Sequence, residues 1–143
     1  MRNYTSSVPA ETSITNIKRK LVAAGAKNFH EYYENGLVIE IMFTIPVDGN
    51  DRAFKLPARV NQVYNKLLNS YRSLNNEKRK TALAQANRTA WKNMHDWVDL
   101  QMTLIELGQT TITEVMFAHM YSISKGKTLF EISAENGLKA LPL

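Results

Sequence analysis

Apolar residues recur at helical spacing along much of the chain, and this pattern predicts most of its elements. A first helix is expected over residues 9–24, where apolar side chains repeat every three or four positions. A second is expected over 57–71 and a long third over 77–107, which Gly108 ends. T-x-x-E sequences beginning at Thr111 and Thr128 predict N-terminal capping boxes, and so the starts of two short helices.

Between the first two helices the pattern changes to that of a β-hairpin. The dipeptide Asn35-Gly36 supplies the residues that a two-residue type I′ turn prefers. The arm that follows it, residues 37–45, is rich in β-branched and aromatic side chains. The sequence VDGND predicts a further turn, and a short strand is expected over 52–56.

These elements together predict an α+β fold. We expect a small antiparallel sheet with one helix, followed by a long helical hairpin and short C-terminal helices. The chain is interpreted as a single domain over residues 1–143, with a sheet-rich half at 1–56 and a helical half at 57–143. Residues 2–7 are expected to add a short strand, and the final NGLKALPL is interpreted as a tail.

The amino-acid composition limits the classes of protein to which the chain can belong. Hydrophobic residues make up 44% of the chain and charged residues 22%, which is ordinary for a globular protein. Cysteine is absent, so disulfides and thiol nucleophiles are excluded. The N-terminal sequence has no signal-peptide pattern, and no apolar run approaches the roughly 20 residues that a membrane helix needs. We therefore expect a soluble cytoplasmic protein without membrane contact or cofactor.

The charge is unevenly distributed. The net charge is +5, and residues 72–92 contain six basic residues against one acid, whereas residues 93–143 contain three against six. Basic clusters can neutralise phosphates and so bind nucleic acid without reading its sequence, although an ordinary solvated face has the same composition. The candidate nucleic-acid-binding residues are Lys18, Arg19, Lys20, Lys78, Arg79, Lys80, Arg88 and Lys92.

His95 and Asp96 are adjacent in the expected long helix, and a His-Asp pair can bind a metal in hydrolases. Neighbours on a helix point about 100° apart, so these two do not converge on one ion. His95 and Asp99 do share a face and can hold a metal if other ligands arrive from elsewhere. We favour the alternative, a solvated polar face on which Asp99 stabilises His95.

Two further motifs are interpreted as turns. SKGKT, at residues 124–128, resembles the end of a phosphate-binding loop, but the required glycine is replaced by Tyr121 and the segment follows a helix rather than a strand. It is more simply a basic connection in which Thr128 caps a helix. DGND lacks the ligand run and the terminal Glu of a calcium loop.

The long helix resembles that of small, mostly uncharacterised proteins carried by bacteriophages and mobile elements. The pattern is A-W-x-x-x-x-D-W-x-x-x-Q-x-x-L-I-E, here running from Ala90 to Glu106. The opening YTSSVPAETS is also similar. The resemblance implies an accessory role near nucleic-acid transactions, or in countering host defence, and it transfers no catalytic residues.

Three functions follow in order of preference. The first is a non-enzymatic accessory protein in a bacterial host cell that binds nucleic acid or a nucleoprotein complex. The second is an anti-CRISPR-like inhibitor that binds a host defence protein through the acidic second half of the chain. The third is a metal-dependent phosphohydrolase using His95 and Asp99. The long helix, rich in Trp and Met, also permits a homodimer. The candidate protein-binding residues are Asp96, Asp99, Glu106 and Glu114.

Overall fold

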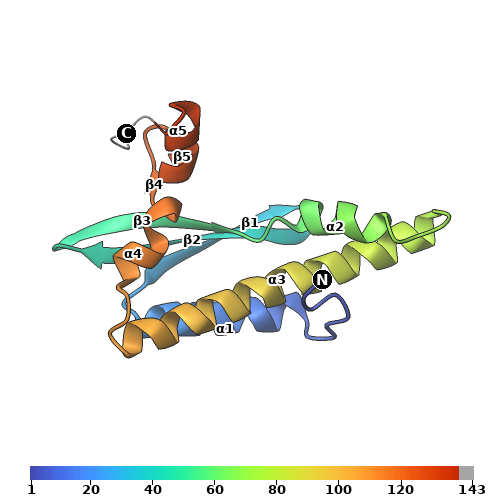
Figure 1. The fold of residues 1–143 in the computed structure, drawn as a ribbon, viewed down its shortest axis with the longest axis horizontal. Helices are drawn as coiled ribbons and strands as arrows, with labels where there is room; N and C mark the ends of the chain where they lie inside the picture. Colours follow the sequence, from blue (N-terminus) through green and yellow to red (C-terminus); the bar gives the residue numbers. More distant parts are fainter. Residues whose placement is uncertain (139–143) are drawn as a thin grey trace.

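A three-stranded antiparallel sheet forms the centre of the computed structural model, which describes residues 1–138 (Figure 1). Its strands are β1 (Lys27–Glu34), β2 (Leu37–Val47) and β3 (Asn50–Pro57), in the order β1-β2-β3. With the helices described below, the fold is α+β, as the sequence predicts.

Both turns of the sheet are two-residue turns with positive φ at both positions. Asn35 and Gly36 have φ of 52° and 77°, and Asp48 and Gly49 have φ of 51° and 81°. This is the backbone of a type I′ turn, whose twist matches that of the strands it joins. The Asn-Gly turn is confirmed, and the turn in VDGND is of the same kind.

Two helices cover one face of the sheet (Figure 1). They are α1 (Ala10–Ala23) and the long α3 (Asn76–Glu106), and each lies within a residue or two of the predicted bounds. The helix α2 (Val60–Leu68) follows β3 in the sequence and packs against α3. The predicted start of α2 was wrong, because Pro57 is the last residue of β3, and the helix ends at Leu68 rather than at residue 71.

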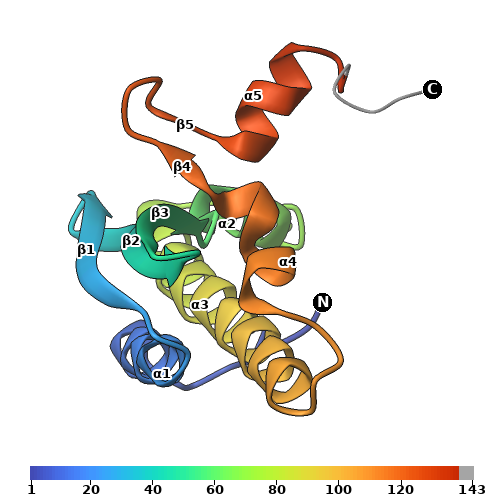
Figure 2. The ribbon, with the colours of Figure 1, turned by 90° about the vertical axis from the view of Figure 1, so that its left-hand side faces the viewer.

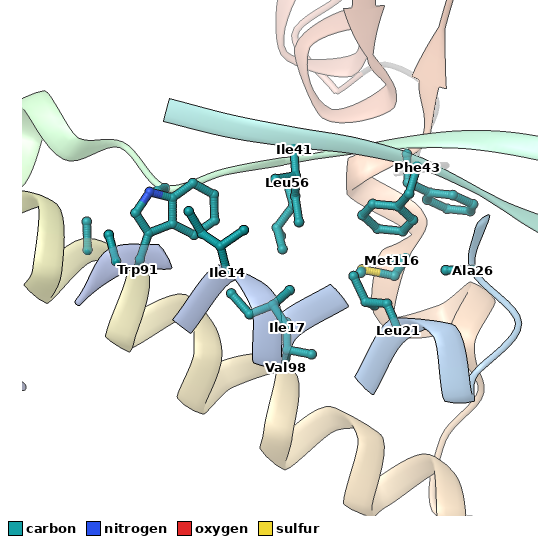
Figure 3. Packing of buried hydrophobic residues seen from close by; sticks show 14 of the residues in the cluster. Ile14, Ile17, Leu21, Ala26, Ile41, Phe43, Leu56, Trp91, Val98 and Met116 are labelled. Carbon is teal, nitrogen blue, oxygen red and sulfur yellow. The ribbon is translucent and has the colours of Figure 1, made fainter. Parts of the chain in front are cut away.

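The core lies between the sheet and these helices (Figure 3). The inward residues of β2 and β3 face each other in register, with Phe43 opposite Phe54 and Ile41 opposite Leu56. Trp91 from α3 is fully buried among them, and its indole Nε1 donates a hydrogen bond to the Val38 carbonyl at 2.8 Å. The Trp indole therefore joins the middle of α3 to the start of β2.

After α3 the chain passes through α4 (Ile112–Met116), whose Met116 belongs to the core, to the other side of the sheet, where the remaining elements lie (Figures 1 and 2). The helix predicted after Thr111 is shorter than expected: α4 passes into the 3-10 helix η1 (Phe117–His119). Next come a small hairpin of β4 (Tyr121–Ser122) and β5 (Lys127–Thr128), which the sequence did not predict, and α5 (Leu129–Glu135).

The SKGKT motif spans the end of the hairpin turn and all of β5. The Gly126 amide donates a hydrogen bond to the Ser122 carbonyl at 2.8 Å. Thr128 accepts from the Glu131 amide, and Glu131 accepts from the Thr128 amide, so the predicted capping box is confirmed. Of the predicted tail, residues 139–143 lie outside the described part of the chain.

The N-terminal strap, residues 2–7, is not the strand that the sequence predicted. It forms turns in which Asn3 has φ of 60°, and it lies against α3. The buried Thr89 hydroxyl donates to the Asn3 carbonyl at 2.8 Å, while Gln85 and Arg88 both donate to the Ser6 carbonyl at 3.1 Å. Side chains of α3 satisfy the carbonyls of the strap, and so no strand partner is needed.

Candidate functional site

The basic cluster on α1 is largely neutralised within the molecule. Lys18 forms an ion pair with Glu31 of β1, and the Lys20 Nζ lies 2.7 Å from the Asp99 Oδ1 of α3. The hydrogen bond from Lys18 lowers the pKa of Glu31, and the one from Lys20 lowers the pKa of Asp99. Arg19 remains exposed and bonds the Asn16 side chain. These lysines mainly join α1 to its neighbours.

Arg88 and Lys92 are also engaged inside the fold. Arg88 donates from Nε to the Ser6 carbonyl and from an Nη to the Gln85 side chain at 2.7 Å. Lys92 Nζ lies 3.3 Å from an oxygen of Asp96. Both side chains are half-buried. They hold the N-terminal strap and the polar face of α3, and they have little freedom to reach a phosphate.

The remaining predicted cluster has no such partners. Lys78, Arg79 and Lys80 occupy the first turns of α3, and within residues 1–138 none of them takes part in an ion pair. Lys78 donates to the hydroxyl of Ser73 at 3.1 Å, which leaves its charge uncompensated. The Asn75 side chain accepts from the Lys78 amide at 2.8 Å and so fixes the start of the helix.

Two more cations lie in the same region, which we call the hairpin tip and define as residues 66–80. Lys66 lies in the last turn of α2, and Arg72 lies in the connection to α3. Both are exposed, and neither forms an ion pair in the part of the chain that the structure describes. The tip thus has five basic residues against Glu77 alone, and it supplies most of the net charge of +5.

The tip projects from the end of the molecule beyond the sheet and α1 (Figure 1). The two KRK sequences do not form one site, because Lys20 contacts Asp99, which is twenty residues along α3 from Arg79. At 1.5 Å per residue this separation is about 30 Å. The candidate functional site is therefore the hairpin tip by itself.

The KRK pattern predicts three of the five cations of the tip and leaves out Lys66 and Arg72. Arg72 belongs to the basic run at residues 72–92 but lies outside the KRK tripeptide. Lys66 lies in a different helix, and only the antiparallel packing of α2 on α3 brings it to the same end. The sequence does contain a signal for both residues. In two antiparallel helices joined by a short connection, the end of the first helix lies beside the start of the second.

The interpretation of His95 needs correction. Its Nδ1 lies 3.0 Å from Asp96 Oδ1, whereas Asp99 pairs with Lys20, so Asp99 is not its partner. Burial raises the pKa of Asp96, but hydrogen bonds from Asn3, His95 and Lys92 outweigh it and hold the pKa well below its usual range. In residues 1–138 no three His, Asp or Glu side chains are grouped as a metal site.

This network gives a prediction about acid stability. A depressed carboxylate pKa stabilises the fold above the unfolded value, near 4, and this stabilisation is lost as the pH falls through the folded pKa. We expect Asp96→Asn to lower the free energy of unfolding at pH 7 by about 1–3 kcal/mol. We also expect the variant to lose less stability on acidification than the wild type.

Urea unfolding of both proteins between pH 7 and pH 3 measures this difference. Asp48→Asn is the matched control, since Asp48 is exposed in a turn whose positive φ asparagine also tolerates. If Asp96→Asn and wild type have the same stability at pH 7, the network around Asp96 does not stabilise the fold.

The four acidic candidates do not gather into one patch. Asp96 and Asp99 are engaged by the strap and by α1. Glu106 is the last residue of α3, and Glu114 is exposed in α4, where its amide and carboxylate bond Thr111. Asp96 and Asp99 thus form contacts within the fold and are not free for a partner protein.

A hollow of about 320 Å³ lies between the outer side of the sheet and the C-terminal elements. Lys55 Nζ lies 3.5 Å from Glu40, and Arg59 and Glu131 line the same hollow. Burial lowers the pKa of His119 at its wall, so this imidazole is neutral at pH 7. The hollow is thus lined by two cationic and two anionic side chains, and their formal charges sum to zero.

Comparison of the chain with protein-family models, with curated proteins and with solved structures gave no match. No helix within residues 1–138 is both long and apolar enough to cross a membrane. The geometry and charge of the hairpin tip are accordingly the features of the molecule that bear on its function.

Proposed function

We propose that the protein binds nucleic acid, alone or in a nucleoprotein complex, by placing the cations of the hairpin tip on phosphates. The observation that carries this proposal is that four exposed basic residues and the half-buried Lys78 lie together and form no ion pair within residues 1–138, while Lys18, Lys20 and Lys92 are neutralised inside the fold. Cations that neutralise phosphates release the counterions condensed on the nucleic acid, and that release drives association. The activity is binding, with no covalent step.

The resemblance of the long helix to proteins of phages and mobile elements supports an accessory role in the same setting. Such a role requires affinity for phosphate backbones more than recognition of bases, since phosphate contacts position a protein and base contacts specify a sequence. The tip supplies charged side chains and hydroxyls of the kinds that bind phosphate oxygens.

A salt titration tests the proposal. Purified protein is mixed with fluorescently labelled DNA, and the binding constant is measured by anisotropy from 50 mM to 300 mM NaCl. If all five cations contact phosphates of a duplex, the logarithm of the constant falls with the logarithm of salt with a slope of about −4.5. Absence of binding at 50 mM NaCl, for DNA and for RNA, would refute the proposal.

A further inference from the structure

The three cations at the start of α3 point in different directions. Successive residues of an α-helix are rotated by about 100°. Lys78 and Lys80 therefore leave the helix on nearly opposite sides, and Arg79 lies between them. All three are in the regular helix that Asn75 caps, so their relative directions are fixed.

This arrangement matches a ligand that has phosphates on two sides. An α-helix with its side chains is about 10–12 Å across, and the major groove of B-form DNA is about 12 Å wide with a phosphate backbone along each edge. Two lysines on opposite sides of α3 can reach both edges. A single strand lying along one side of the helix contacts only some of the three cations.

The tip also lacks a surface on which unpaired bases can stack. Proteins that bind single strands combine a basic groove with exposed aromatic side chains. Tyr71 is the one aromatic residue of the tip, and it is half-buried. Tyr64, in the preceding turns of α2, packs against the core. The exposed apolar residue at the tip is Leu74, which has no ring.

From these observations we infer that the hairpin tip binds B-form duplex DNA, with Lys78 and Lys80 on phosphates of the two strands that border one groove. The inference rests on the proposed function and specifies its ligand. Arg79 and the flanking Arg72 then face the groove and the nearer backbone, and contacts to bases are not required.

The first test compares a labelled 20-base-pair duplex of mixed sequence with each of its single strands, in the same buffer at 0.15 M NaCl. Each phosphate contact adds about 0.9 to the salt slope for a duplex and about 0.7 for a single strand. Three contacts to the duplex against two to the single strand therefore correspond to roughly tenfold tighter binding of the duplex. Equal or tighter binding of the single strands overturns the inference and leaves the proposed function intact. Failure of both ligands to bind overturns both.

The second test uses the single variants Lys78→Ala, Arg79→Ala and Lys80→Ala. If the groove lies between Lys78 and Lys80, each variant at these two positions reduces the salt slope for the duplex by about 0.9. Lys125→Ala, in the exposed turn between β4 and β5, is the matched control and keeps the wild-type slope. A wild-type slope in either Lys78→Ala or Lys80→Ala overturns the two-sided contact. Circular dichroism confirms that each variant is folded.

Discussion

Replacing Trp91 with alanine is expected to lower the free energy of unfolding by about 3–5 kcal/mol, the usual cost of truncating a fully buried large aromatic side chain. Trp91 is 0% exposed and is among the largest buried side chains of the core. Its removal leaves a cavity between α3, α1 and the sheet (Figure 3). It also leaves the Val38 carbonyl without the indole donor at 2.8 Å, which adds a desolvation cost.

Urea unfolding followed by circular dichroism measures this effect. Leu100→Ala is the control, because Leu100 lies on the same helix but is 55% exposed, and its truncation is expected to change the free energy of unfolding by less than about 0.5 kcal/mol. A small domain has only about 5–15 kcal/mol of stability, so Trp91→Ala removes a large share of it. A loss below about 1 kcal/mol would show that Trp91 does not hold α3 against the sheet.

The second large effect is expected for the triple variant Lys78→Ala/Arg79→Ala/Lys80→Ala. Removal of the phosphate contacts of Lys78 and Lys80 lowers the salt slope by about 1.8, which corresponds to roughly 30-fold weaker binding of duplex DNA at 0.15 M salt. Alanine favours the helix, so α3 should begin where it does in the wild type. The binding constant is measured by anisotropy across the same salt range as for the wild type.

The chain contains its own matched control, because Lys18-Arg19-Lys20 is the same tripeptide on another helix. Its triple alanine variant loses the same charge, but two of the three cations that it removes are paired with acidic residues, and only Arg19 is exposed. Ion pairs at the surface contribute about 0–1 kcal/mol each, and both of these pairs are partly exposed, so the control should remain folded. We expect it to keep most of the wild-type affinity. Equal losses in the two variants would mean that binding follows net charge, and the tip would have no special role.

Elements determined by local interactions could be predicted from the sequence. The Asn35-Gly36 turn follows from the ease with which these two residues adopt positive φ. The long α3 follows from an apolar repeat between a cap and Gly108, and the capping box at Thr128 joins residues three apart. In each case the interacting groups are near neighbours in the chain, so the sequence itself brings them together.

The role of each charged side chain was decided by the tertiary structure. Both KRK sequences look alike, yet Lys20 meets Asp99 only because core packing lays α1 along α3, whereas Arg79 is exposed and forms no ion pair within residues 1–138. The N-terminal strap was misassigned for the same reason. Its turn is held by α3, with Asn3 bonding Asp96 across 93 positions of sequence. Whether a charged side chain is paired depends on the residues that the fold places beside it. Local sequence patterns do not specify contacts between residues that are distant in the chain.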